Sequence, residues 1–337
     1  MILWEYMVFV IAFVVFMLVM WLTKWLIRYL RRVNLVVPDV HKEGRPLVPI
    51  SGGLAVAGGT ISGLMIFIFL RTFFPQPTDR LLLNSSVITS LFAGIITILI
   101  ITLIGFLDDL IVKLNRQESG GLKQWQKPLL TIAAAVPLMA INAGTSTMVL
   151  PFIGRIDIGV IYPLLFVPLG VVGAANMVNL LGGFNGMETG MGAVAVGMLG
   201  LFSLLKGHYL AALISLMAFA ALSAFYWYNK VPARILPGDS LTYFIGGVLV
   251  VIAVIGNMEK AAIIVSIPFI IEFFLKLRGR FKKTTIGYED HGKVRSHYAK
   301  IYSIPHFFTR TGEYTEKQIT YILIFIELCV SSLIWII

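Results

Sequence analysis

Residues 86–107 read SVITSLFAGIITILIITLIGFL, a run of 22 residues without a single charge, and two acids follow it directly. A helix of about 20 apolar residues crosses the roughly 30 Å hydrocarbon layer of a bilayer. The whole chain shares this character, because 58% of its 337 residues are hydrophobic and only 13% are charged. Soluble domains carry roughly 25% charged residues. The sequence therefore predicts an integral membrane protein.

Nine other apolar windows of similar length are present, so we expect an all-α polytopic protein of about ten transmembrane helices. The first run is too long for a signal-peptide core and has no basic segment before it, which indicates a retained span. We treat residues 1–337 as one membrane-embedded domain. The expected spans are 3–27, 50–74, 86–107, 128–147, 158–178, 187–206, 209–228, 240–256, 260–277 and 318–337.

Positive charge alternates between the loops that join these spans. Of the 27 Lys and Arg residues, 21 lie in the first, third, fifth, seventh and ninth loops, and 5 lie in the other four. Cytosolic loops carry such an excess, so we expect the odd loops in the cytosol and both termini on the non-cytosolic side. The net charge of +10 is explained in this way, and no nucleic-acid partner is expected.

The chemically informative side chains fall in these predicted cytosolic loops. They include the acid pair of GFLDDL, the run NMVNLLGGFNGMETG at 176–190, the acid of RILPGDS, and the basic residues of LKLRGRFKK. We expect them to converge into one site for a charged, water-soluble substrate. That site would be built from residues 28–49, 107–127, 176–188, 229–239 and 278–317.

A structural interpretation competes with a functional one at each position. Asp108 and Asp109 end a predicted helix, where the macrodipole disfavours acids, so their placement favours function. Asp239 precedes an apolar span and can be read as an ordinary N-cap. Asn179 could end the fifth span with a glycine turn, although this leaves the other Asn residues of the run unexplained. Arg278 and its neighbours could be flanking charge that contacts lipid heads.

The combination of residues is more specific than any member. Paired acids with Asn suit an oxygen-ligated Mg²⁺ ion, which usually takes one or two protein oxygens plus substrate phosphates and water. Nearby Lys and Arg suit phosphate oxygens. The chain has neither His and Cys at zinc-site spacing nor a G-x-x-x-x-G-K-[ST] loop.

The motifs GFLDD, N-x-x-N-L-L-G-G-F-N-G-M-E-x-G and PGDS, in this order, resemble the polyprenyl-phosphate N-acetylhexosamine-1-phosphate transferases. The similarity runs from P-x-S-G-G at 49–53 to the basic loop near residue 300. It is closest to the archaeal and eukaryotic dolichyl-phosphate N-acetylglucosamine-1-phosphate transferases, because bacterial members usually carry acids where this chain has Gly182 and Asn185. The single His291 replaces the triple-His stretch of the bacterial peptidoglycan-precursor enzymes.

The resemblance implies a reaction in which a lipid phosphate attacks the β-phosphorus of UDP-N-acetylglucosamine and UMP leaves. The implied partners are UDP-N-acetylglucosamine and dolichyl or another polyprenyl phosphate within membrane lipid. The implied cofactor is Mg²⁺, with Mn²⁺ as the alternative. The product opens the N-linked glycan pathway, in the cell membrane of an archaeon or the endoplasmic reticulum of a eukaryote.

The resemblance also assigns roles to individual residues. Asn179 and Asp239 would be metal ligands, Asp108, Asp109 and Lys127 would be catalytic, and Asn185 would contact the uracil near Gly183. The remaining expected substrate-binding residues are Asn176, Glu188, Arg278, Arg280 and His291. Two departures, Ile50 for a Glu near the ribose and Leu236 for a Phe against the uracil, make the sugar less well determined than the reaction.

Other functions stay open at this stage. The same reaction could use undecaprenyl phosphate or another UDP-N-acetylhexosamine for cell-surface polysaccharide. A membrane transporter is the alternative of another class, although transporters place polar residues near the bilayer midplane and these lie at span ends. The sequence does not determine the oligomeric state, and a homodimer is one arrangement it allows.

Overall fold

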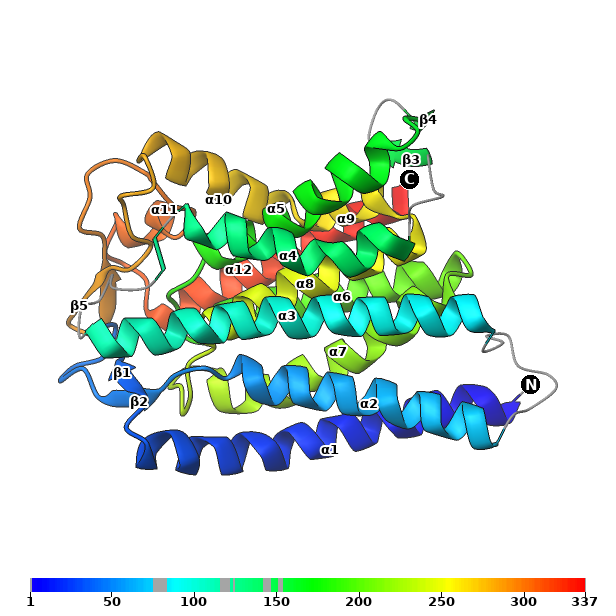
Figure 1. Cartoon of the computed structure of the whole chain (residues 1–337). Coiled ribbons are helices and arrows are strands. Elements are labelled where there is room, and N and C mark those ends of the chain that lie inside the picture. The colour runs from blue at the N-terminus through cyan, green and yellow to red at the C-terminus, as the bar shows by residue number, and fades with distance from the viewer. Residues whose placement is uncertain are drawn as a thin grey trace.

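In the computed structural model, which describes residues 2–74, 84–115, 122–123, 125–141, 147–150 and 154–336, the long helices run side by side in one bundle (Figure 1). The longer helices are α1 (Ile2–Arg32), α2 (Gly53–Phe73), α3 (Ser85–Asn115), α4 (Gln126–Ile141), α5 (Val167–Leu180), α6 (Met187–Leu205), α7 (Tyr209–Asn229), α8 (Gly238–Gly256), α10 (Ile267–Arg278) and α12 (Glu316–Ser331). Shorter helical pieces are η1 (Tyr162–Phe166), α9 (Glu259–Val265), α11 (His306–Thr309) and η2 (Ser332–Ile336).

Helix covers most of the described part of each predicted span, and the all-α membrane architecture is confirmed. The fourth expected span, 128–147, reaches too far, because Thr147 begins a short strand, and its residues 142–146 lie outside the described residues. Eight helices among the described residues are long and apolar enough to cross a membrane, and α4 is a shorter apolar helix. The ninth expected span, 260–277, is wrong as one continuous helix, because the chain breaks at Ser266 into α9 and α10. Pro268 lies in the first turn of α10, where its missing N–H costs no helical hydrogen bond.

Helix α8 lies in the middle of the bundle, against α2, α3, α5, α6 and α7. Almost all of its side chains are buried, as expected for a helix that is apolar on every face. Gly246 lets the backbone of α5 approach, since a Cβ there would lie 2.5 Å from the carbonyl oxygen of Ala174. Small residues permit such close packing between membrane helices, so neighbouring helices can hold the N-terminus of α8 firmly.

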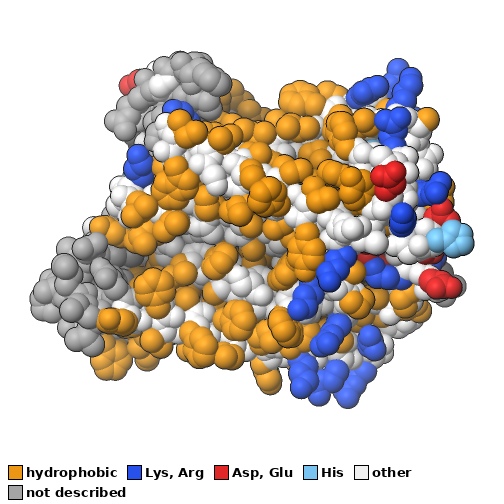
Figure 2. Space-filling view, turned by 180° about the vertical axis from the view of Figure 1, so that it is seen from behind, with side chains coloured by type: hydrophobic (Ala, Val, Ile, Leu, Met, Phe, Trp, Pro, Cys, Tyr) orange, Lys and Arg blue, Asp and Glu red, His pale blue; other side chains and the backbone are white. Residues whose placement is uncertain are grey.

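The loops contain short antiparallel hairpins that the sequence did not predict. They are β1 (Val36–Pro38) with β2 (Leu47–Pro49), β3 (Thr147–Leu150) with β4 (Gly154–Asp157), and β5 (Tyr288–Asp290) with β6 (Lys293–Arg295). The β1–β2 and β5 segments lie at one end of the bundle, and both chain termini lie at the other end (Figure 1). Lys and Arg side chains gather at the β1–β2 end beyond a broad apolar band (Figure 2). This basic end is the one that the charge pattern predicts to face the cytosol.

Candidate active site

Four polar side chains from four helices meet near the basic end of the bundle, and we call them the polar cluster: Asp108 (α3), Lys127 (α4), Asn179 (α5) and Asp239 (α8). Lys127 Nζ lies 2.5 Å from Asp108 Oδ2 and 2.8 Å from Asp239 Oδ2. Asn179 Nδ2 donates to the same Asp239 oxygen at 2.9 Å. Residues up to 131 positions apart in the sequence therefore form one connected group, as the sequence predicted.

Lys127 is the charge centre of this cluster. Its ammonium group bridges two carboxylates, and it is held at the first turn of α4, opposite α3. The side chain of Asp108 is buried, and its Oδ1 also accepts the backbone N–H of Leu122. A paired ammonium group in a largely buried site is well placed to neutralise phosphate charge.

Asp109 accepts hydrogen bonds from the backbone at the start of α8 and not from the side chains of the polar cluster. Its Oδ1 accepts the N–H of Asp239 at 2.7 Å, and its Oδ2 accepts the N–H of Ser240 at 3.3 Å. Free N–H groups at a helix N-terminus favour a carboxylate, so Asp109 fixes the start of α8. Gly238 has φ +69°, and a Cβ there would lie 2.4 Å from Asp109 Oδ2, which requires glycine at this contact.

The position of the acid pair within its helix differs from the expectation. We expected Asp108 and Asp109 at the helix C-terminus, but α3 continues to Asn115. The reason is that apolar residues recur beyond the membrane run, at Leu110 and Ile111, and keep the amphipathic pattern going. Asp108 and Asp109 therefore do not lie at the end of the helix dipole as expected, and the burial of both acids supports the functional interpretation instead.

The donor types beside Asp239 fit a hard divalent ion. Asp239 offers a carboxylate and Asn179 a carboxamide oxygen, both of which Mg²⁺ accepts alongside phosphates and water. Asn179 Oδ1 accepts from Thr242 Oγ1 at 3.1 Å, so half a turn of the carboxamide would direct oxygen toward Asp239. Within the described ranges no three His, Cys, Asp or Glu side chains converge as a metal site, so an ion would depend on Asn179 and on substrate oxygens.

The glycine-rich turn between α5 and α6 is held by an acid at the start of α6. Glu188 Oε1 accepts the N–H of Gly183 at 2.6 Å. Gly183 has φ +128° and Gly186 has φ +80°, conformations that side chains other than hydrogen rarely adopt. The carboxylate of Glu188 thus closes the turn onto the helix that follows it.

Asn185 is buried at the other side of this turn. Its Nδ2 donates to Asp39 Oδ2 at 2.7 Å, and its backbone N–H donates to Glu316 Oε1 at 2.9 Å. Thr320 Oγ1 donates to the carbonyl oxygen of Asn185 at 3.2 Å. Glu316 is held in turn by Lys42 and by His41, whose Nδ1 lies 3.4 Å from Glu316 Oε1. The loop between α1 and α2 and the helix α12 therefore both hold the glycine-rich turn in place.

The structure places the other expected binding residues in different surroundings. Asn176 Nδ2 donates to the carbonyl of Val172, and its Oδ1 accepts from the hydroxyl of Tyr243 at 3.4 Å. Arg278 lies over the ring of Tyr302 at 5.9 Å. Across the described residues, the exposed Arg278, Arg280 and His291 form no hydrogen bond or ion pair with the polar cluster.

Sequence reasoning missed Asp39, His41 and Glu316. The first two lie in a loop that we read only for its basic residues. Glu316 stands next to Thr315, whose side chain forms a capping box with Gln318. The T-x-x-Q pattern marks a helix start and could have drawn attention to the neighbouring acid.

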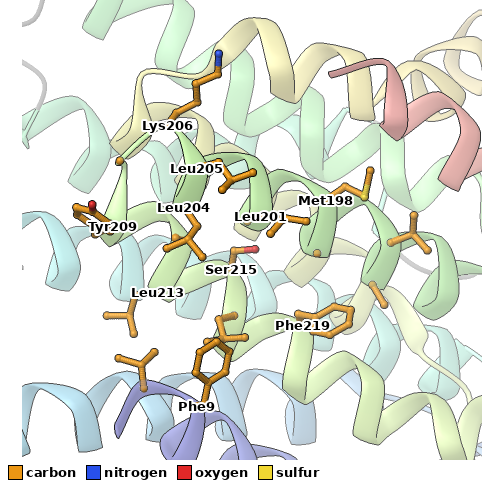
Figure 3. Close-up of a pocket in the computed structure, with 18 of the residues that line it drawn as sticks. Phe9, Met198, Leu201, Leu204, Leu205, Lys206, Tyr209, Leu213, Ser215 and Phe219 are labelled. Carbon is orange, nitrogen blue, oxygen red and sulfur yellow. The ribbon is translucent and has the colours of Figure 1, made fainter. Parts of the chain in front are cut away.

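A large apolar cavity lies elsewhere. Its volume is about 1010 Å³, and its walls come mainly from α6 and α7, with Phe9 of α1 at one side and Lys206 and Tyr209 at one end (Figure 3). None of the residues expected from the sequence to form the site lines this cavity. The polar chemistry and this hydrophobic space are therefore separate features.

Comparisons of this chain with known proteins agree on one family. Residues 91–257 match glycosyl transferase family 4. A Saccharolobus solfataricus protein, provisionally named UDP-N-acetylglucosamine--dolichyl-phosphate N-acetylglucosaminephosphotransferase, is 32% identical over 87% of this chain and 85% of its own length. A Sulfolobus acidocaldarius protein of the same provisional name is 29% identical over 88% and 85%.

A bacterial relative matches a smaller part. The phospho-N-acetylmuramoyl-pentapeptide-transferase of Lactiplantibacillus plantarum is 32% identical over 50% of this chain and 53% of its own length. The family match at residues 91–257 contains all four residues of the polar cluster and Asp109. The chain therefore belongs to glycosyl transferase family 4 and is a membrane-embedded phosphotransferase.

Proposed function

We propose that this protein transfers N-acetylglucosamine-1-phosphate from UDP-N-acetylglucosamine to dolichyl phosphate, with Mg²⁺ as cofactor and UMP as the second product. The observation that carries the proposal is the partly buried polar cluster, in which Lys127 joins Asp108 and Asp239. The names of the two relatives from Saccharolobus solfataricus and Sulfolobus acidocaldarius support the donor and the acceptor. The reaction would be the first step of lipid-linked oligosaccharide synthesis for N-glycosylation, on the cytosolic face.

The chemical step needs little proton transfer. A phosphate monoester has a second pKa near 6, so the lipid phosphate is mostly ionised at pH 7. One of its oxygens forms a bond to the β-phosphorus while the bond from that phosphorus to the bridging oxygen breaks, and UMP departs with the bridging oxygen. Such transfers depend mainly on positioning and on neutralising charge. The residues required are therefore cations and groups that hold them.

Lys127 would supply the fixed cation between the two phosphates. Asp108 holds Lys127 from the α3 side, and Asp239 holds it from the α8 side, so the ammonium group has little freedom to move away. Asp109 keeps Asp239 in place by accepting its backbone N–H. We therefore assign Asp108 and Asp109 to positioning rather than to proton abstraction.

Asp239 and Asn179 are the residues that would hold Mg²⁺. The ion would neutralise pyrophosphate charge and orient the departing UMP, and Mn²⁺ has the same preference for oxygen donors. Asn185 and the turn at Gly183 would receive the uracil. Arg278 ends α10, and Arg280 and His291 lie in the segment that follows it; all three would contact the sugar or pyrophosphate from the exposed side.

The test is transfer by purified protein in lipid nanodiscs. The assay contains Mg²⁺, UDP-N-acetylglucosamine labelled in the sugar, and dolichyl phosphate. We expect label in the lipid phase together with an equal amount of UMP. Undecaprenyl phosphate, and UDP-N-acetylmuramoyl-pentapeptide as donor, serve as the comparison substrates. A reaction without lipid phosphate and one with excess EDTA are the controls.

Each outcome has a distinct meaning. Release of UDP instead of UMP would show an ordinary glycosyl transfer and would overturn the mechanism. Faster turnover of the pentapeptide donor would move the protein toward the peptidoglycan-precursor reaction. Uptake of label into the vesicle lumen without lipid product would support transport instead.

A further inference from the structure

The carboxylate of Asp39 fixes the orientation of the Asn185 carboxamide. Its side chain is 4% exposed, and that of Asp39, which it contacts at 2.7 Å, is 5% exposed. The oxygen and nitrogen of an amide are commonly assigned from their neighbours. A carboxylate offers only acceptors, so the amide group that faces Asp39 must be the NH₂ group. Turning the amide over would bring oxygen against oxygen in a buried place.

The oxygen on the opposite side of the same carboxamide accepts no hydrogen bond from the described residues. Throughout the described parts of the chain, no group donates a hydrogen bond to Asn185 Oδ1. Asn185 Oδ1 is not one of the fully enclosed side-chain oxygens that lack a partner, such as Glu188 Oε2, so it retains accessible surface from which a donor can approach. The available acceptor lies on the glycine-rich turn, six residues after Asn179 of the polar cluster. A ligand at the cluster could therefore donate to it.

The backbone of Asn185 is held independently of its side chain. Glu316 Oε1 accepts its N–H at 2.9 Å, and Thr320 Oγ1 donates to its carbonyl oxygen at 3.2 Å. The position of the residue is thus set by α12, whereas the orientation of its amide is set by Asp39. These two roles can be separated by mutation.

We infer that Asp39 determines which pyrimidine the site accepts, because it makes Asn185 present an oxygen to the base. Uracil carries a hydrogen on ring nitrogen N3 and can donate to that oxygen. Cytosine has a bare N3 acceptor at the same position and would oppose the oxygen with another lone pair. The inference rests on the proposed function, since it takes a nucleotide to be part of the donor.

The experiment compares inhibition of the transfer reaction by UMP and by CMP. Neither nucleotide has to be a substrate, so the ratio of their inhibition constants reports base recognition alone. We expect the wild-type protein to prefer UMP. In Asp39→Asn the carboxamide at position 39 can accept or donate, so both orientations of Asn185 become available. We expect the CMP-to-UMP ratio to fall about tenfold, the value of one net hydrogen bond.

Thr320→Val is the matched control from the same buried network, because Thr320 Oγ1 bonds the carbonyl oxygen of Asn185. Its change acts on the backbone of Asn185, so inhibition by both nucleotides should weaken alike and the ratio should stay as in the wild type. Asn185→Ala is the second variant, and it should lose the preference even where Asp39→Asn proves too unstable to purify. Melting temperatures of all variants are measured alongside.

An unchanged ratio in Asp39→Asn, or a full preference for UMP in Asn185→Ala, would overturn the inference. A wild-type protein that binds UMP and CMP equally would also overturn it, while leaving the transfer reaction intact. Failure of the wild-type protein to move sugar phosphate to any lipid would instead refute the proposed function. The two failures are therefore distinguishable.

Discussion

The side chain of Asp109 accepts the backbone N–H of Asp239 at 2.7 Å, so one acid of the site holds the peptide that carries another. Asp109 lies on α3 and Asp239 on the first turn of α8. Close packing of these helices depends on Gly105, because a Cβ there would lie 2.3 Å from the carbonyl oxygen of Asp239. The geometry of the polar cluster therefore follows from the packing of two membrane helices.

This relationship makes Gly238 sensitive to substitution. Gly238→Ala would press a methyl group onto the Asp109 carboxylate and displace the start of α8. We expect kcat to fall about 100-fold, the loss that a misplacement of about 1 Å can cause. Gly207→Ala is the matched control, because Gly207 also has a positive φ but open space around it. Both variants should lose some Tm, and equal kcat in the two would contradict the prediction.

Lys127→Met removes the cation that joins Asp108 and Asp239. The phosphates would then meet two carboxylates without their ammonium partner. We expect kcat to fall by about 10²–10³, as when one electrostatic stabiliser is removed from an active site. The exposed Lys123 provides the comparison, and Lys123→Met should keep wild-type kcat. The measurement is initial rate at saturating donor, and similar losses in both variants would refute a specific role for Lys127.

Asp239→Asn tests the expected metal site. The variant keeps the size of the side chain but loses the charge that an ion and Lys127 both need. We expect turnover to be lost at Mg²⁺ concentrations that saturate the wild type, while size-exclusion profile and Tm still indicate folded protein. Glu43→Gln removes an acid from an exposed loop and is the control for net charge. Wild-type Mg²⁺ dependence in Asp239→Asn would remove Asp239 from the metal site.

Glu188 should affect binding of the donor more than the chemical step. In Glu188→Ala the N–H of Gly183 loses its acceptor, and the turn that would receive the base loosens. We expect KM for UDP-N-acetylglucosamine to rise about tenfold with little change in kcat. Glu188→Gln retains an oxygen acceptor and should lie close to the wild type. A fall in kcat at unchanged KM would show that the turn contacts the reacting phosphates instead.

The buried side chain of His306 makes the free energy of unfolding depend on pH. Burial, with the nearby charge of Lys276 adding to it, lowers the pKa of His306 to about 4. An imidazole in the unfolded chain has a pKa near 6.5. The unfolded state therefore binds more protons between these values, so the free energy of unfolding falls as pH drops from about 6.5 toward 4.

The measurement is Tm between pH 7 and pH 5. We expect His306→Asn to lose less Tm over this range than the wild type, because its side chain has no proton to take up. Its oxygen can still accept the N–H of Tyr302, which His306 Nδ1 accepts at 3.2 Å. Parallel loss of Tm in both proteins would assign the pH dependence to other groups.

Much of the membrane architecture could be predicted, because the thickness of the bilayer sets the length of the apolar helices that cross it. The polar cluster was also predictable, since alternate loops bring Asp108, Lys127, Asn179 and Asp239 to one face. The break of the helix at Ser266 could not be predicted, because the residues on both sides of it are apolar and read as one continuous span. The contact of Asp39 with Asn185 joins residues 146 positions apart and depends on how a hairpin folds back, which no local pattern encodes.

The contact between Asn185 and Glu316 has a consequence for biosynthesis. Glu316 comes 77 positions after Asp239, the last residue of the polar cluster in the sequence, and a ribosome adds roughly 5–20 residues per second. A growing chain therefore holds the complete polar cluster for several seconds before the residue that anchors its glycine-rich turn has been made. The glycine-rich turn therefore gains this anchor only when the start of α12 has been synthesised.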